Sequence, residues 1–233
     1  TGQVHLGVGA FMRSHTAVYN AAAIASGDRR WGIAGVSLRQ PTVREQLRPQ
    51  DCLYTVATCD NDGTTRRLVG SLRTIDVAPD DPQRVVQILA DPASRVVTIT
   101  VTEKGYCLAP DSGALDTANV DVAHDVATPD APRSMPGFLV AAMQGRRVNN
   151  AGPLTVVACD NLPDNGVRLR RSVLELADLV DPALRAWIDA SVRFPATMVD
   201  RIVPATTVED LDDCERAIGL RDEAMVKTEP FMQ

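Results

Sequence analysis

The sequence predicts an α/β domain, with a doubly wound, mostly parallel sheet and an antiparallel hairpin as an extension. Its apolar side chains are mainly aliphatic, with 45% hydrophobic but only 4% aromatic residues, which suits buried parallel strands. Short β-branched runs alternate with segments of helical period along most of the chain. A glycine-lined turn, Gly7-Val8-Gly9, joins the first apolar run to the first helical segment. Such alternation is typical of a parallel sheet covered by helices.

A strand–helix–strand unit is predicted at the start of the chain. Residues 4–9 form an apolar strand, residues 13–26 carry apolar side chains at helical spacing, and residues 31–38 form a second strand. A short helix over 41–47 begins at a proline, which is favoured in a first helical turn. The two strands should be parallel, with a right-handed crossover.

The hairpin is predicted by residues 53–59 and 65–72, which flank the turn sequence Asp60-Asn61-Asp62-Gly63. The polar, Asp- and Pro-rich residues 102–132 predict a long loop, and loops of this length usually have a functional reason. Further helices are predicted over 81–90, 136–147, 165–180, 181–192 and 208–218, and further strands over 95–101, 154–159, 198–203 and 224–228.

Composition argues against several classes of function. The net charge of -6 on 233 residues disfavours a surface for nucleic acid or an anionic membrane, and no apolar run is long enough for a membrane span. Five cysteines, with no Cys-x-x-Cys pair, predict reduced thiols and a cytoplasmic protein. The three histidines lack metal-ligand spacing, so no metal is expected. No Walker loop or Gly-x-Ser-x-Gly elbow supports nucleotide or serine hydrolysis.

The ends of the sequence predict a domain of a longer protein. Thr1 stands almost directly before the first strand, and residues 229–233 follow the last predicted element without a closing helix. We therefore expect residues 1–233 to form one domain, with a further domain elsewhere in the full-length chain.

The Gly7-Val8-Gly9 turn predicts a seat for a pyrophosphate. A strand that passes to a helix through glycines leaves backbone N–H groups and the positive end of a helix dipole facing a ligand. The dinucleotide fingerprint places a third glycine where Met12 stands, so the motif is incomplete. A glycine turn that binds nothing is the alternative.

The end of the second strand bears on cofactor choice. NAD sites usually place an acid there for the ribose hydroxyls, whereas NADP sites place an arginine. No acid occurs between Ser37 and Val43, and Arg39 and Arg44 are present, which leans toward NADP or dual use. The alternative is that both arginines are simply solvated.

Polar residues also follow the later strands. An asparagine amide at Asn161 could donate a hydrogen bond to an alkoxide that forms from a carbonyl. Composition favours the alternative, in which residues 160–165 form a polar turn that caps the next helix. Two pairs of adjacent opposite charges are present: Glu103 with Lys104 follows the strand predicted over 95–101, and Asp200 with Arg201 lies in the strand-like run over 198–203. Such pairs are usually solvated, but at the carboxyl end of a strand they would line a cleft.

Four segments together carry a family resemblance. In order they are VHLGVGAFMRSH at 4–15, TEKGYC at 102–107, CDNLPDNG at 159–166 and FPATMVDRIVP at 194–204. They closely resemble the polyol-specific long-chain dehydrogenases, the mannitol dehydrogenase family, over essentially the whole chain.

This resemblance implies a nicotinamide-binding Rossmann-type domain followed by a mostly helical domain that completes the active site. It implies reversible, metal-free hydride transfer between NAD, with NADP as the alternative, and a secondary alcohol or ketone of a polyol or sugar acid, of the mannitol/fructose or mannonate/fructuronate type. The family's general base is a lysine in a Lys-x4-Asn-x2-His pattern, which is absent from these residues. We therefore expect the chain alone to be inactive.

The resemblance also assigns roles. It implies that Asn161 stabilises an oxyanion, Asp200 orients the active site and Glu103 lies near the nicotinamide. The family usually has His where this chain has Met12, so a polar contact near the cofactor is expected to be lost. The cofactor-binding set combines the glycine turn, the strand ends and this resemblance: Gly7, Val8, Gly9, Ala10, Phe11, Arg13, Ser37, Arg39, Thr102 and Asn161. The alternative function is a module that binds NAD(P) without catalysis.

Overall fold

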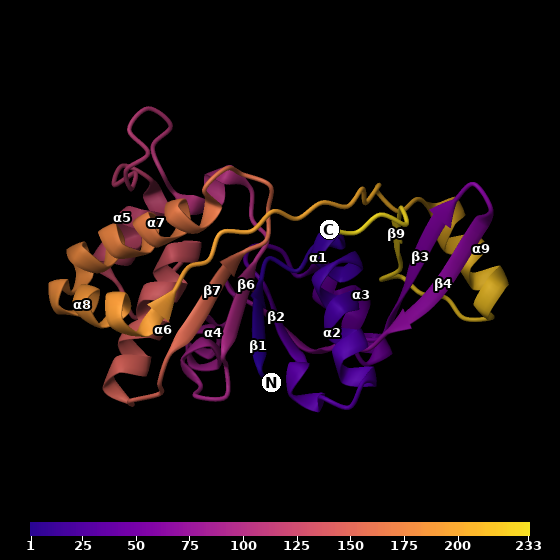
Figure 1. Ribbon diagram of the computed structural model, residues 1–233, viewed down its shortest axis with the longest axis horizontal. Helices are drawn as coiled ribbons and strands as arrows, with labels where there is room; N and C mark the ends of the chain where they lie inside the picture. Colours follow the sequence, from indigo (N-terminus) through magenta and orange to yellow (C-terminus); the bar gives the residue numbers. More distant parts are fainter.

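The computed structural model describes residues 1–233 and contains a six-stranded sheet, a separate three-stranded sheet and flanking helices (Figure 1). The main sheet has the order β5-β2-β1-β6-β7-β8, and all its pairings are parallel. Its strands are β1 (Gln3–Leu6), β2 (Ile33–Ser37), β5 (Leu72–Val77), β6 (Val96–Ile99), β7 (Leu154–Ala158) and β8 (Val192–Arg193). Counted along the chain, this is the doubly wound order 3-2-1-4-5-6, which reverses between β1 and β6. The predicted fold class is confirmed.

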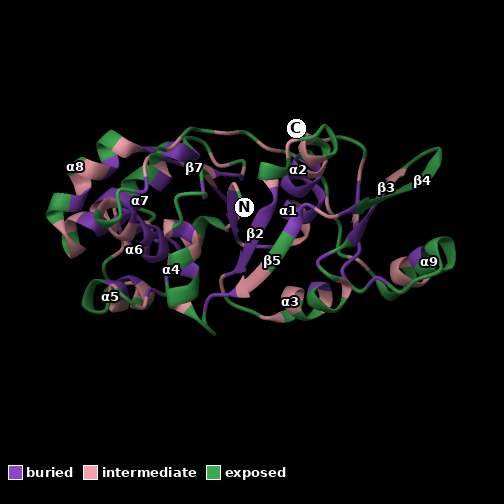
Figure 2. Cartoon of the chain, turned by 90° about the horizontal axis from the view of Figure 1, so that it is seen from below, coloured by how far each residue is buried: buried purple, intermediate pink, exposed green.

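The predicted hairpin is present, but it belongs to its own sheet. β3 (Tyr54–Asp60) and β4 (Gly63–Val69) pair antiparallel, and β9 (Val226–Thr228) pairs parallel with β3. The hairpin projects from the body of the molecule, and most of β4 is exposed (Figure 2). It is an insertion between β2 and β5 and does not lengthen the main sheet.

Helices connect and cover the strands. They are α1 (Ala10–Ser14), α2 (Thr16–Ala25), α3 (Thr42–Leu47), α4 (Pro82–Ala90), α5 (Val120–Ala127), α6 (Met135–Val148), α7 (Asn165–Val180), α8 (Pro182–Ser191) and α9 (Val208–Ile218), with 3-10 turns η1 (Arg29–Trp31), η2 (Arg48–Gln50) and η3 (Glu103–Tyr106). The helix predicted over 13–26 is divided at His15, whose backbone leaves the helical range at φ -117° and ψ -89°. None of these helices is long and apolar enough to cross a membrane.

Four segments differ from the sequence prediction. Residues 198–203, expected to be a strand, have no regular secondary structure, because Asp200 exchanges two backbone hydrogen bonds with Gln233 instead of joining the sheet. The segment crosses the carboxyl edge of the sheet (Figure 1). Residues 102–132 contain η3 and α5, and the Asn119 side chain caps α5. The sequence prediction also missed the short strands β5 and β8.

A buried arginine joins two loops at the amino edge of the sheet. Arg146 of α6 is fully buried, and its guanidinium donates to six backbone carbonyls, with N···O distances from 2.8 to 3.3 Å. Three of these carbonyls belong to the last turn of α4 and the loop from α4 to β6, and three lie between α6 and β7. No carboxylate forms an ion pair with Arg146, so its hydrogen-bond partners are carbonyl dipoles, with the Asp91 carboxylate acting only at longer range.

Removing this guanidinium should be costly. We expect Arg146→Met to lower the free energy of unfolding by at least ~3 kcal/mol, because it leaves several buried carbonyls without donors. The neighbouring Arg147 forms a partly exposed ion pair with Asp181, and Arg147→Met should cost less than ~1 kcal/mol. Urea denaturation of both variants checks this, and equal losses would contradict it.

Candidate functional site

Two pockets flank the glycine turn at the carboxyl edge of the main sheet. The pocket on the β2 side has a volume of about 510 Å³, and the pocket on the β7 side about 460 Å³. We call them the β2-side and β7-side pockets. They share five lining residues from the turn and from the end of β6: Gly7, Gly9, Thr100, Val101 and Thr102. The turn therefore lies between two adjoining cavities at the switch point of the sheet, where ligands of doubly wound folds bind.

Gly7 is required by the backbone. Its φ is +94°, and a Cβ atom there would lie 2.1 Å from the carbonyl oxygen of Thr100. Gly9, in contrast, has extended backbone, and a Cβ atom there would meet nothing closer than the Gly7 oxygen at 3.9 Å. Gly9 thus leaves open space directly before α1, whose first N–H groups have no partner within the helix.

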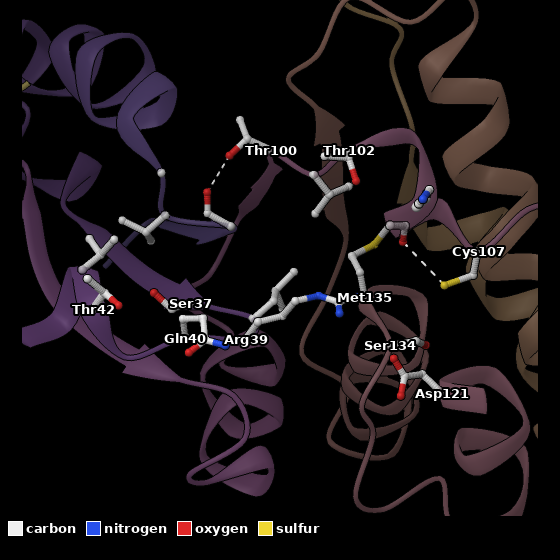
Figure 3. Close-up of a pocket in the computed structure, with 18 of the residues that line it drawn as sticks. Ser37, Arg39, Gln40, Thr42, Thr100, Thr102, Cys107, Asp121, Ser134 and Met135 are labelled. Carbon is white, nitrogen blue, oxygen red and sulfur yellow. Dashed lines mark hydrogen bonds between the residues drawn. The ribbon is translucent and has the colours of Figure 1, made fainter. Parts of the chain in front are cut away.

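The end of β2 lines the β2-side pocket with Ser37 and Arg39. Ser37 is buried, whereas Arg39 is exposed and reaches across the pocket (Figure 3). The second arginine that the sequence singled out, Arg44, forms an ion pair with Asp80 and lies outside both pockets. Of these two arginines, only Arg39 lines the β2-side pocket, where it could contact a ligand.

Asn161 is exposed in the β7-side pocket, and its neighbours build the turn that carries it. The Asp160 carboxylate accepts hydrogen bonds from the Leu162 N–H and from Asn165 Nδ2, both at 3.1 Å, and from the Tyr106 hydroxyl. Burial, followed by the contact with Asp160, raises the pKa of Tyr106, so Tyr106 stays a neutral donor. The neighbours of Asn161, Asp160 among them, therefore form the polar turn, and the Asn161 amide itself remains available to a ligand.

Asn165 ties this turn to the segment that crosses the sheet edge. Its fully buried amide donates to the carbonyl of Thr197 at 3.1 Å and accepts from the Thr197 N–H at 3.0 Å. Three residues further on, Asp200 is exposed and lines the β7-side pocket with Asn161. The structure thus brings together two of the three predicted catalytic residues.

Arg201 anchors the segment after β8 to the interior of the protein. Its guanidinium is buried and donates to the Ser14 carbonyl at the end of α1 and to the Glu229 carbonyl at 2.9 Å. The predicted Asp200–Arg201 charge pair is therefore split. Both residues line the β7-side pocket, but the Arg201 guanidinium is bound by backbone carbonyls, whereas Asp200 is exposed.

Glu103, Arg13 and Met12 do not line either pocket. The Glu103 side chain is 69% exposed, with Arg168 at 3.5 Å. Arg13 is buried, where it donates to the carbonyls of Ala224 and Gly9, the latter at 3.4 Å, so it contacts the glycine turn from behind. Met12 is fully buried in a hydrophobic cluster with Val8, Ala17 and Tyr54, so the position of the missing third glycine faces the core and not the cleft.

The remaining predicted cofactor residues lie at the pockets. Val8 lines the β2-side pocket, Ala10 and Phe11 line the β7-side pocket, and Thr102 lines both. Phe11 stacks on His15 with ring centroids 4.9 Å apart. Lys104, which the sequence placed at a strand end, lines the β2-side pocket as expected. The sequence analysis missed several other lining residues: Thr42, Thr100, Cys107, Asn119, Asp121, Ser134 and Met135. Recognising α5 through its Asn119 cap could have found Asn119 and Asp121.

Known proteins share this architecture. A family model described as the mannitol dehydrogenase Rossmann domain matches residues 1–233. The chain is 41% identical over 234 residues to D-mannonate oxidoreductase of Escherichia coli (strain K12), covering 99% of this chain and 48% of that protein. It is 41% identical over 236 residues to mannitol 2-dehydrogenase of Cereibacter sphaeroides, covering 100% of this chain and 49% of that protein.

A solved structure agrees. Pseudomonas fluorescens mannitol 2-dehydrogenase, in a ternary complex with NAD and D-mannitol, has a TM-score of 0.95 and 38% identity, covering 100% of this chain and 48% of that chain. The fold and the glycine turn thus define a Rossmann-type dinucleotide-binding domain. The chain belongs to the mannitol dehydrogenase family, which confirms the resemblance, and it spans about half the length of the curated relatives it matches.

The two glycines of the turn should respond differently to a methyl group. We expect Gly7→Ala to lower the free energy of unfolding by about 2 kcal/mol or more, because of its positive φ and the clash with Thr100. Gly9→Ala should change it by less than ~1 kcal/mol, since the added Cβ meets open space. Chemical denaturation of the two variants is the measurement, and similar stabilities would refute this assignment.

Proposed function

We propose that this chain is the cofactor-binding half of an NAD(P)-dependent oxidoreductase that acts on a polyol or sugar acid. The observation that carries the proposal is the open space at Gly9, between two adjoining pockets at the switch point of the sheet. A nicotinamide dinucleotide would supply or accept the hydride at a secondary alcohol or ketone. Relatives named for mannitol and for D-mannonate support substrates of the mannitol/fructose or mannonate/fructuronate type.

The residues present fit such a cofactor. The N–H groups of Gly9, Ala10 and Phe11 precede or begin α1 and would receive the pyrophosphate. Ser37 and Arg39 would lie by the adenosine ribose, with Thr102 nearer the nicotinamide. The absence of an acid among residues 37–43 and the free Arg39 leave room for a 2′-phosphate. NAD is our first choice from the relatives, with NADP as the alternative.

The chemistry that we propose rests on the β7-side pocket. The Asn161 amide would donate to the substrate oxygen on which negative charge develops, and Asp200 beside it would orient the substrate or the base. Glu103 would act only together with groups from a second domain, because its side chain is exposed outside both pockets. We propose that this second, mostly helical domain provides the lysine base, so the chain alone binds cofactor without turnover. Its five free cysteines support a cytoplasmic location.

Cofactor binding tests the proposal directly. Calorimetric titration of the 233-residue chain should detect binding of NADH or NADPH. Gly9→Ala should weaken that binding at least ~10-fold, about 1.4 kcal/mol, because its Cβ occupies the pyrophosphate space. The melting temperature of Gly9→Ala serves as the folding control. Absence of binding by the wild-type chain to either nucleotide would rule the function out.

Asn161 can be tested for a catalytic role. In a protein that joins this chain to its helical domain, Asn161→Ala should lower kcat by roughly 10²–10³-fold, as expected for loss of an oxyanion donor. The unfolding midpoint should stay near wild-type, because the turn is held by Asp160 and Asn165. A near-normal kcat for Asn161→Ala would mean that Asn161 is a surface residue of the turn without a catalytic role. Binding of NADH by the wild-type two-domain protein without any turnover would favour the alternative of a non-catalytic module.

A further inference from the structure

A row of buried polar side chains leads to the glycine turn from within the sheet. Gln3 and His5 alternate along β1 with the core residues Val4 and Leu6, and both are at most 4% exposed. The β1–β6 register pairs His5 with Thr98, which is also buried. Buried polar groups away from water must satisfy one another, so their hydrogen bonds carry information about their protonation.

The hydrogen bonds form one continuous chain. At its far end, Asn20 Nδ2 on α2 donates to the Trp31 carbonyl at 2.9 Å and to Gln3 Oε1 at 2.8 Å. Gln3 Nε2 donates to Thr98 Oγ1 at 2.8 Å, and Thr98 Oγ1 lies 2.7 Å from His5 Nδ1.

The near end of the chain reaches the turn. His5 Nε2 lies 2.9 Å from Thr100 Oγ1, and the Thr100 hydroxyl donates to the carbonyl of Gly7 at 2.6 Å (dashed line at Thr100 in Figure 3). Thr100 is the only member of the row that lines the pockets, and His5 is fully buried behind it.

The two ends fix the direction of the chain independently. A carbonyl can only accept, so Thr100 donates its single hydroxyl proton to the Gly7 carbonyl and must accept a hydrogen bond from His5 Nε2. From the other end, the Trp31 carbonyl can only accept, so it fixes Asn20 Nδ2 as a donor, and Gln3 Oε1 accepts from Asn20. Gln3 Nε2 then donates to Thr98 Oγ1, and the Thr98 hydroxyl proton is directed to His5 Nδ1. Both arguments give the same neutral tautomer of His5, protonated on Nε2.

We infer that His5, held as its Nε2–H tautomer, and Thr100 are positioning residues that fix the glycine turn for a dinucleotide. The inference rests on the proposed function. Thr100 holds the Gly7 carbonyl, while the N–H of Val8 donates to the Val36 carbonyl of β2 at 3.4 Å. The Gly7–Val8 peptide is thus tethered between the strands on either side of β1.

This tether sets the orientation of the amides that follow it, at Gly9 and Ala10. A binding loop that is already in its bound geometry loses less conformational freedom when the ligand arrives. Burial lowers the pKa of His5 to about 3, so the imidazole stays neutral and the direction of the chain persists at physiological pH.

The tautomer can be observed directly. In the ¹⁵N NMR spectrum of the 233-residue chain, we expect His5 Nε2 to resonate as a protonated nitrogen and Nδ1 as an unprotonated, hydrogen-bonded one. The Nδ1–H tautomer would overturn the inference, because Nε2 would then accept the Thr100 proton and leave Gly7 without a donor.

Matched variants test the positioning role. We expect Thr100→Val, which keeps the shape without the hydroxyl, to weaken binding of NADH and of ADP-ribose about tenfold, whereas Thr100→Ser should stay within about threefold of wild-type. ADP-ribose has the pyrophosphate but no nicotinamide, so an equal loss for both ligands assigns the effect to the turn. Affinities are measured well below the melting temperature of each variant, so a loss of stability alone does not change them.

His5→Gln separates positioning from direct contact. Its amide retains one donor and one acceptor, while His5→Leu retains neither, and neither side chain reaches the pockets. We expect tighter NADH binding by His5→Gln than by His5→Leu. Wild-type affinity in Thr100→Val would overturn the inference even if His5→Leu fails to fold. Lack of binding by the wild-type chain would instead remove the proposed function, and the positioning role with it.

Discussion

The close approach between Gly7 and the Thr100 carbonyl is the constraint on which the site depends. Only a residue without a Cβ can turn at φ +94° this close to the end of β6. That contact brings the β1–α1 turn against the carboxyl edge of the neighbouring strand at the point where the sheet reverses its winding. The two pockets adjoin because they share this contact, and the same junction orients the amides before α1.

Polar residues around the pockets divide into two groups. Asp160, Asn165 and Arg201 have their hydrogen bonds satisfied inside the protein, where they hold the β7 turn and the segment after β8. Asn161 and Asp200 are exposed and point at the space where a ligand would lie. Each residue of the second group follows or precedes one of the first. Of two adjacent residues, one is therefore held by hydrogen bonds within the protein, and the other is exposed in the β7-side pocket.

Much of the fold could be predicted from sequence, because aliphatic strands, proline at helix starts and a hairpin turn are local signals. The prediction failed where the cause is not local. Residues 198–203 have strand-like composition, yet they pair with Gln233 by two backbone hydrogen bonds, a long-range contact with no sequence signature. For the site, Asn161 and Arg39 were predicted from strand ends, whereas the prediction of Asp200 rests on the family resemblance, since the strand expected over 198–203 is absent. Other features could not be predicted, because they depend on which way each side chain points. These are the burial of Arg13, the inward direction of Met12 and the proposed role of Thr100. An error of two residues in a strand or helix boundary already changes those directions.

At the opposite edge of the sheet, Arg146 holds two loops through carbonyl oxygens and without a carboxylate. An ion pair at that place would weaken as its acid became protonated, and exposed ion pairs weaken further as salt screens them. A guanidinium bound to carbonyl groups has no partner that titrates, and it is shielded from counterions by burial. The base of the sheet is therefore joined by an electrostatic contact that is less sensitive to acidity and to ionic strength than an ion pair would be.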